Sequence, residues 1–464
     1  MAGTQDEASH EARSGAPKGS RRAIARLRAA SRGAYPLWRG RLLFLVGGIG
    51  VGLAAVLMAK GADLAQAGFR RIVEPEPLVA LILTPAGFAL AALLALTVFP
   101  NSQGSGIPQV IAARHARDAG YRQSLISPRV AVGKVLVLFL GLFCGASAGR
   151  EGPTVQVGAA IMAAFGRLTP ERLPGLLLAG GAAGVAAAFN TPLAGIVFGI
   201  EELGRAYEAR SSALIAAGIV AAGLTSIWLS GNYTYFGTTQ ATLPASAGWI
   251  VPVLALVGGL AGGVFSRLLI LFARGLPGRA GRLIRRRPVL FAALCGLGVA
   301  GCGLASGGAA YGTGYEEARA ILHGDSAASL AFAPLKFVAT VLSSVSGIPG
   351  GLFAPSLAVG AGLGGTVHVM AQDLLPGVEV GALVLIGMVA YLAGVLQAPI
   401  TSFVIVTEMT QNHALIIPLM IAALIADAAS KAICRGGLYH TLAEIMLERA
   451  APPEPAAPAA AERG

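Results

Sequence analysis

The feature that most constrains this chain is a close succession of apolar segments from Leu42 to Ala429, separated by Gly and Pro. Several of them, such as Thr154 to Phe165 and Ile400 to Val406, are shorter than the roughly 20 residues that a straight transmembrane helix needs. Short apolar segments of this kind are typical of transporters whose helices are interrupted near the middle of the bilayer. The pattern predicts an all-α polytopic membrane protein with broken helices.

Composition supports this fold class. Only 12% of the residues are charged and 55% are hydrophobic, whereas a soluble domain carries about 25% charged residues. The net charge of +12 fits basic cytoplasmic loops and tails under the positive-inside rule, so we expect no nucleic-acid partner. The Cys and His residues lack metal-ligand spacing, so we expect no metal and no cofactor.

Three regions are expected along the chain. Residues 1–35 form a basic cytoplasmic tail, in which Arg21 to Arg32 is either an amphipathic surface helix or a disordered stretch. Residues 36–450 form the transmembrane domain, whose Arg-rich loop from Arg274 to Arg287 is assigned to the cytoplasm. Residues 451–464 form a short tail rich in Pro and Ala, too short for a further domain.

The transmembrane region contains an internal repeat, with halves at residues 36–235 and 236–450. The residues that align between the halves include Lys134 with Lys336, Gly149 with Gly351, Pro153 with Pro355 and Glu201 with Glu408. Two halves broken at corresponding places indicate a transporter whose site lies at the interface of the repeats. The alignment leaves open whether the halves are inverted.

Three pentads of the form Gly-x-x-x-Pro mark the candidate site, namely GSGIP at 104–108, GREGP at 149–153 and GLFAP at 351–355. Each follows a break and opens a helix, with Pro where its missing N–H is tolerated. Backbone N–H groups at helix starts attract anions through partial charges. Because no full cation lies beside the ion, binding stays weak enough for the ion to leave again. Glu151, in the second pentad, lies between apolar segments, where a carboxylate costs on the order of 3 kcal/mol and is a functional hypothesis by default.

The pentads, in this order and separation, resemble the signature of the CLC family of chloride channels and proton-coupled chloride transporters. The similarity extends over roughly Leu42 to Ala450 and includes AAAFNTPLAGIVFGIEE (186–202), TEMTQNHALIIP (407–418) and GGLYHTL (436–442). The resemblance implies two inverted halves, a homodimer with one pathway in each subunit, and chloride and protons as substrates. It also implies a multi-pass protein of the bacterial inner membrane, with both termini in the cytoplasm.

The resemblance further implies which residues hold chloride. Ser105 and Tyr439 would contribute hydroxyls, and Leu352 and Phe353 their backbone N–H groups. Two structural alternatives stay open, because Ser105 could be the N-cap of the next helix and Tyr439 could belong to an interfacial aromatic belt. Ser at position 105 favours chloride, since nitrate preference in the family goes with Pro there.

The same resemblance assigns the proton to two carboxylates. Glu151 would be the gate, which occupies the anion site when charged and carries a proton when it swings out. Glu202 would be the inner proton-transfer residue and favours antiport, with a helix-end role as its alternative. Arg150 and Lys134 would give electrostatic support to the ion path, or else Arg150 would fix its loop and Lys134 would snorkel to the surface.

Two other functions remain open. A passive chloride channel of the same family would fit if Glu202 were idle. The stretch from Gly145 to Gly149 matches the GxSxG pattern of serine hydrolases, so an intramembrane hydrolase with Ser147 as nucleophile is a remote alternative. That pattern requires a strand-to-helix turn and a base, and neither is expected beside an apolar helix, so we expect no enzyme.

Overall fold

The computed structural model describes residues 18–166, 169–204, 212–231, 234–326, 329–374 and 376–450, with side chains from residue 41 onward except residue 212. These residues form helices and connecting turns, and no strand occurs among them. Of the two expected tails, residues 1–17 and 451–464 lie outside the described part. The stretch from Arg21 to Arg32 belongs to a helix that begins at Lys18 and continues to Val73.

The α-helices, in chain order, are α1 (Lys18–Val73), α2 (Ala80–Thr97), α3 (Ile107–His115), α4 (Ala119–Leu125), α5 (Pro128–Phe143), α6 (Glu151–Gly166), α7 (Leu173–Phe189), α8 (Pro192–Phe198), α9 (Ser212–Ser230), α10 (Ile250–Arg274), α11 (Gly278–Arg286), α12 (Pro288–Ala305), α13 (Tyr315–His323), α14 (Phe332–Val345), α15 (Phe353–Ala371), α16 (Val380–Leu396), α17 (Pro399–Thr410), α18 (Ile416–Ile433) and α19 (Leu438–Ala450). Short 3-10 turns cover Pro77–Val79, Pro170–Arg172 and Ala245–Ala247. A π-helical turn, η3, covers Gly199–Gly204, and such turns often occur at functional positions.

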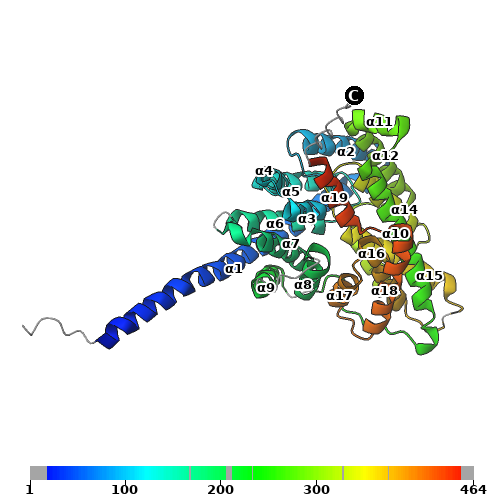
Figure 1. Ribbon diagram of the computed structural model, residues 1–464. Helices are drawn as coiled ribbons and strands as arrows, with labels where there is room; N and C mark the ends of the chain where they lie inside the picture. Colours follow the sequence, from blue (N-terminus) through cyan, green and yellow to red (C-terminus); the bar gives the residue numbers. More distant parts are fainter. Residues whose placement is uncertain are drawn as a thin grey trace, which may run out of the picture.

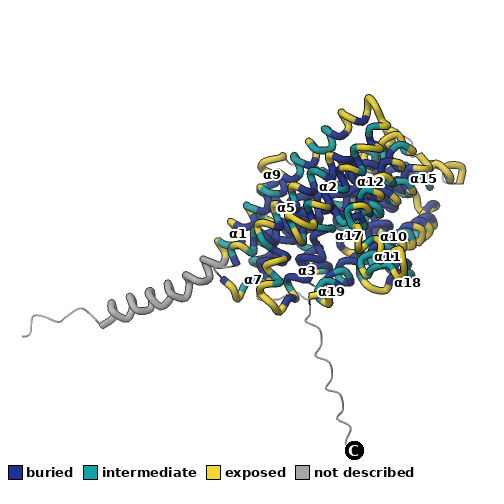
Figure 2. The backbone as a smooth tube through the Cα atoms, turned by 90° about the horizontal axis from the view of Figure 1, so that it is seen from above, coloured by how far each residue is buried: buried dark blue, intermediate teal, exposed yellow. Residues whose placement is uncertain are grey.

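The outer surface is apolar, as a membrane requires. Within the described ranges, nine helical segments are long and apolar enough to cross a bilayer. Large side chains on their outer faces are exposed, among them Leu57 at 70%, Ile82 at 77% and Trp228 at 82%, and Figure 2 shows exposed residues along the outside of a buried interior. An apolar surface of this extent is unfavourable in water but suits contact with lipid. These findings confirm the prediction of an all-α polytopic membrane protein.

The two halves are built alike around two buried helices. In Figure 1 the helices α3 to α9 lie on one side and α14 to α18 on the other. The buried helix of the first half is α7, which packs against α6, and that of the second is α16, which packs against α15. At the first crossing Gly158 lies against the carbonyl of Gly180, and at the second Gly360 lies against that of Gly387. Any side chain at these glycines would push the helices apart.

The halves are related by inversion. Gly149 and Gly351 donate to each other's carbonyl oxygens, both at 2.7 Å, in an antiparallel bridge, a pairing in which the two strands of backbone run in opposite directions. The breaks after α7 and α16 also match, since Asn190 and Gln397 both adopt the left-handed conformation with φ of 58° and 56°. The predicted broken helices and two inverted repeats are thus confirmed.

Candidate functional site

The three pentads meet at one place between the halves. Gly149 of the second pentad pairs with Gly351 of the third, as described above. Gly104 of the first pentad donates to the carbonyl of Ile348 and accepts from the N–H of Gly350, both at 3.2 Å. The helices α3, α6 and α15 therefore begin beside one another, so that three positive helix ends face a common region.

Ser105 lies in the middle of this junction and does not cap a helix. The N-cap of α3 is Gly106, which has φ of 103° and receives no side-chain hydrogen bond. The hydroxyl of Ser105 instead lies against Gly152 of the second pentad, where an added Cβ would come within 2.5 Å of it. The N-cap alternative for Ser105 is therefore wrong.

Tyr439 approaches the same junction from the second residue of α19. Its side chain is fully buried, which excludes a place in an interfacial aromatic belt. It lies near Ser105, yet neither hydroxyl forms a hydrogen bond of normal geometry with a described residue. Two buried hydroxyls without an acceptor are costly, and both could donate to one anion between them.

Leu352 and Phe353 supply backbone donors at the start of α15. Both residues are buried, and N–H groups in the first turn of a helix have no acceptor within that helix. The ring of Phe353 is held by aromatic contacts across the two halves, with ring centroids 5.8 Å from both Phe189 and Phe198. These contacts hold the start of α15 against the ends of α7 and α8.

Glu151 is the first residue of α6 and is completely buried. Its carboxylate folds back over Gly149 and lies near Pro355 and the N–H of Ala354, where α15 begins. Neither oxygen forms a hydrogen bond of normal geometry with any residue that the structure describes. The carboxyl group of Glu151 is thus held at the helix starts, in the position where an anion would be attracted.

Arg150 points away from the pentads toward α1. Its guanidinium donates to the Asp63 carboxylate and to the carbonyl of Ala59, both at 2.8 Å. It also lines a cavity of about 800 Å³ bounded by α1, the loop before α13 and the Ala305 end of α12. Arg150 therefore anchors the second pentad to α1 and adds positive charge to the cavity wall.

Lys134 and Lys336 hold loops and do not snorkel, since neither is exposed. The ammonium group of Lys134 donates to the carbonyls of Gln103 and Gly104, at 3.1 and 2.8 Å. Lys336 donates in the same way to the carbonyls of residues 310, 311 and 312, at 2.8 to 3.1 Å. Lys134 thus positions the loop that carries Ser105.

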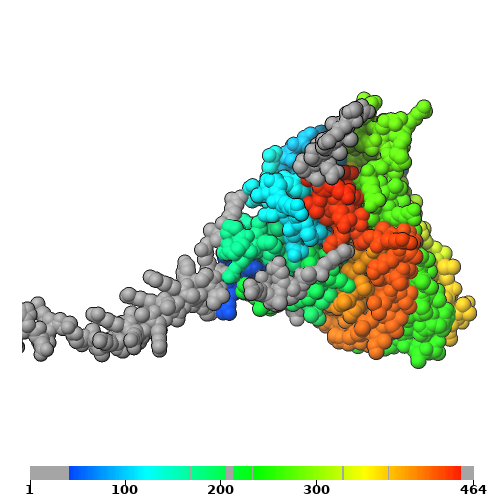
Figure 3. All heavy atoms as spheres, viewed as in Figure 1, coloured from blue at the N-terminus to red at the C-terminus, as the bar shows by residue number. Residues whose placement is uncertain are grey.

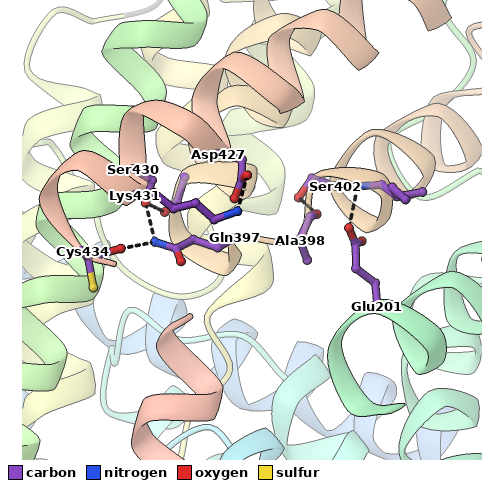
Figure 4. Close-up of polar contacts among 10 residues, drawn as sticks. Glu201, Gln397, Ala398, Ser402, Asp427, Ser430, Lys431 and Cys434 are labelled. Atoms are coloured by element: carbon purple, nitrogen blue, oxygen red, sulfur yellow. Dashed lines mark hydrogen bonds and ion pairs between the residues drawn. The ribbon is translucent and has the colours of Figure 1, made fainter. Parts of the chain in front are cut away.

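The adjacent glutamates of η3 point to different partners. Glu201 accepts hydrogen bonds from backbone N–H groups at the start of α17, as Figure 4 shows. Glu202 is buried, and the ring of His440 on α19 lies beside it. His440 Nε2 is 2.9 Å from the Glu202 carbonyl oxygen and 3.8 Å from Oε1. Glu202 therefore lies next to the helix that carries Tyr439.

Sequence reasoning missed two residues, Asp63 and His440. Asp63 lies in an apolar helix and its partner Arg150 is far along the chain, so no local pattern links them. His440 directly follows the candidate site residue Tyr439 within GGLYHTL, and this adjacency is a signal that could have identified it. Its contact with Glu202 depends on how α19 packs.

Ser147 is not arranged as a nucleophile. It follows α5 in a loop, and its hydroxyl pairs with that of Thr340 at 2.9 Å. Its N–H donates to the hydroxyl of Ser343 at 3.0 Å. The strand-to-helix turn that a hydrolase of this type needs is not formed here, and the structure does not support the hydrolase alternative.

The fold and the site together define a class of protein. It is a helical membrane protein with two inverted repeats, in which the starts of three helices meet between the halves. The family model described as voltage gated chloride channel matches residues 87–431. The chain belongs to this family, the CLC family.

Two relatives named H(+)/Cl(-) exchange transporter ClcA show the similarity in sequence. That of Yersinia pestis bv. Antiqua (strain Angola) is 31% identical over 432 residues, which covers 86% of both chains. That of Salmonella typhimurium (strain LT2) is 32% identical over 384 residues and covers 78% of this chain and 79% of the relative.

Solved structures show the similarity in fold. A slow cyanobacterial Cl⁻/H⁺ antiporter superposes with a TM-score of 0.75 at 25% identity, covering 89% of this chain and 98% of the other. A CLC-type fluoride/proton antiporter gives 0.70 at 22% identity, covering 88% and 98%.

Proposed function

We propose that this protein exchanges chloride for protons across a membrane. The observation that carries the proposal is the junction of three helix starts, at which the neighbouring hydroxyls of Ser105 and Tyr439 find no acceptor of normal geometry among the residues that the structure describes. A chloride ion is such an acceptor and carries the charge that helix starts attract. The names of the ClcA relatives support the same function.

In this proposal chloride is held by donors that bear no full charge. The hydroxyls of Ser105 and Tyr439 and the N–H groups of Leu352 and Phe353 surround the ion. Hydrogen-bond donors of this kind replace the hydration shell but bind weakly enough for release. No further cofactor takes part, and the substrates are chloride and the proton.

The proton uses the two buried carboxylates near this position. Glu151 follows Arg150, which lines the cavity, and Glu202 lies beside His440 of α19. A charged Glu151 occupies the anion position, and protonation lets it move away and take the proton with it. Chloride and the Glu151 carboxylate then compete for one place, which couples the two ions.

The orientation and assembly are proposed on the resemblance to the family. The protein would form a homodimer with one pathway in each subunit, in the inner membrane of a bacterium. Both termini would face the cytoplasm. Arg449, near the end of α19, donates to the carbonyl of Ala273 at the end of α10. Because α11 follows α10 after three residues, this contact supports placing the Arg-rich α11 on the same side of the membrane as the end of α19.

The decisive experiment is proton uptake into proteoliposomes driven only by a chloride gradient, with the voltage clamped by potassium and valinomycin. We expect uphill proton movement. Chloride flux without proton movement would support the passive channel instead and leave Glu202 without a transport role. Absence of flux of both ions would contradict the chloride assignment, and fluoride and nitrate would then be tested in the same vesicles.

A further inference from the structure

Six arginines gather on α11 and its flanking residues and form what we call the α11 arginine surface. They are Arg274, Arg279, Arg282, Arg285, Arg286 and Arg287, and all are exposed. The ion pairs found in the described part of the chain involve other residues. The sequence also contains no Asp or Glu from residue 212 to residue 315. Six like charges therefore lie together without a carboxylate from their own region to neutralise them.

The helices on either side place this surface at the edge of the membrane. α10 ends at Arg274 and α12 begins at Pro288, and both are candidate membrane spans. α11 is separated from α10 by three residues and from α12 by one, so it cannot move far from the bilayer. In Figures 1 and 3 the green segment at the top of the molecule, beside the red α19, carries α11.

The surface also presents apolar side chains among its charges. Leu283, within α11, is 61% exposed, and Leu290, in the first turn of α12, is 52% exposed. A helix with basic and apolar side chains at this depth fits the boundary between headgroups and acyl chains. A water-facing partner such as a nucleic acid would give Leu283 no apolar environment.

We propose that the α11 arginine surface binds the headgroups of anionic phospholipids. Guanidinium groups form paired hydrogen bonds with phosphate oxygens, and a bilayer supplies phosphates at the level of α11. Clusters of basic residues next to membrane spans are drawn to anionic leaflets in this way. The lipid neutralises the arginines and holds together the ends of α10 and α12. This site is separate from the proposed ion pathway.

The test uses the full chain, purified in detergent, with two variants of four arginines. In the first, Arg279, Arg282, Arg285 and Arg286 are changed to Gln. In the second they are changed to Lys, which keeps the charge. Lipid binding is measured by native mass spectrometry and by the rise in melting temperature on addition of phosphatidylglycerol, phosphatidylcholine or inorganic phosphate.

We expect phosphatidylglycerol to bind and stabilise the unaltered chain more than phosphatidylcholine does. The Gln variant should bind phosphatidylglycerol at least tenfold more weakly, because four basic residues near the membrane surface are lost. The Lys variant should bind with an affinity between those of the unaltered chain and the Gln variant, because it keeps the charge but loses the paired guanidinium hydrogen bonds. Equal binding by the Gln variant would overturn the proposal, because the lipid would then bind elsewhere. A response to inorganic phosphate equal to that to phosphatidylglycerol would also overturn it, because a free anion would then suffice.

A further measurement keeps the test decisive if the Gln variant is poorly folded. Binding of phosphatidylglycerol to the unaltered chain should weaken as ionic strength is raised with sodium gluconate, and a salt-independent affinity would contradict the proposal. Chloride flux in phosphatidylcholine vesicles is recorded in parallel. Loss of chloride flux would contradict the proposed transport function only. The lipid proposal is tested by the binding measurements alone.

Discussion

Glu201 and Glu408 each cap the first turn of a helix in the opposite half of the molecule. Glu201 accepts from the N–H groups of Ile400 and Thr401, at 3.1 and 2.6 Å. Glu408 accepts from those of Leu193 and Ala194, at 3.2 and 2.8 Å. The two glutamates align in the internal repeat, so each half makes the same contact with the other half. Together the two contacts link the start of α8 to the start of α17.

We expect Glu201→Gln and Glu408→Gln each to destabilise the protein by about 1–2 kcal/mol, because each removes a charged acceptor from a helix start. Thermal unfolding in detergent measures the effect. Glu444→Gln, an exposed change on α19, is the control and should be near neutral. Unchanged melting of both cap variants would show that these contacts add no stability.

Glu151→Gln should abolish proton movement and leave chloride flux. The neutral amide cannot exchange a proton and no longer competes with chloride as an anion. Proton and chloride fluxes are measured together in proteoliposomes. Coupled transport that persists in this variant would refute the assignment of Glu151 as the gate.

Glu202→Gln should stop proton flux and spare chloride flux, since Glu202 lies beside His440 of α19 and is not one of the groups proposed to hold the ion. Its neighbour Glu201 offers a matched comparison, because Glu201→Gln should alter stability and keep coupling. If Glu202→Gln still moves protons against their gradient, the proton enters by another route.

His440→Ala should slow proton flux while chloride flux stays near its original value. The ring contacts both the carbonyl and the carboxylate of Glu202, and losing one hydrogen bond of about 1 kcal/mol corresponds to about fivefold in rate. The ratio of proton to chloride flux is the measured quantity. An equal fall in both fluxes would mean that His440 acts only on stability.

Ser105→Pro should shift selectivity from chloride toward nitrate, because it removes the hydroxyl and the backbone N–H at the helix junction. Ser105→Ala, which removes the hydroxyl alone, separates the two contributions. Flux or binding is compared for chloride, bromide and nitrate. An unaltered selectivity series would remove Ser105 from the ion site.

Lys134→Met should weaken chloride binding, because the carbonyls of Gln103 and Gly104 next to Ser105 each lose a charged donor, a hydrogen bond of about 1.5–3 kcal/mol. Each carbonyl keeps a second donor, from Gln109 and Gly350 respectively, so the loop should shift and not unfold. Lys336→Met is the matched control, since it frees carbonyls of a distant loop. It should lower thermal stability to a similar extent but keep chloride affinity, as measured by calorimetry. Equal loss of affinity in both variants would indicate a general effect of charge.

The internal repeat shows which structural features can be predicted from local sequence patterns. Gly149 aligns with Gly351 and Asn190 with Gln397, and the structure gives each pair the same backbone role. Such features can be read along the chain because glycine, proline and apolar spacing act on neighbouring residues. The three pentads likewise begin helices, as their Gly and Pro predict.

What the sequence determined by itself was therefore the class of fold, the breaks in the helices and the residues that carry the family signature. The tertiary structure decided what the charged side chains do, for example that Arg150 reaches α1, that Lys134 holds the loop before Ser105, and that Glu201 and Glu202 diverge. The reason is that most of their partners are backbone carbonyl and N–H groups from distant segments. Every residue but proline carries the same backbone groups, so no residue type marks in advance which of them will be the partner.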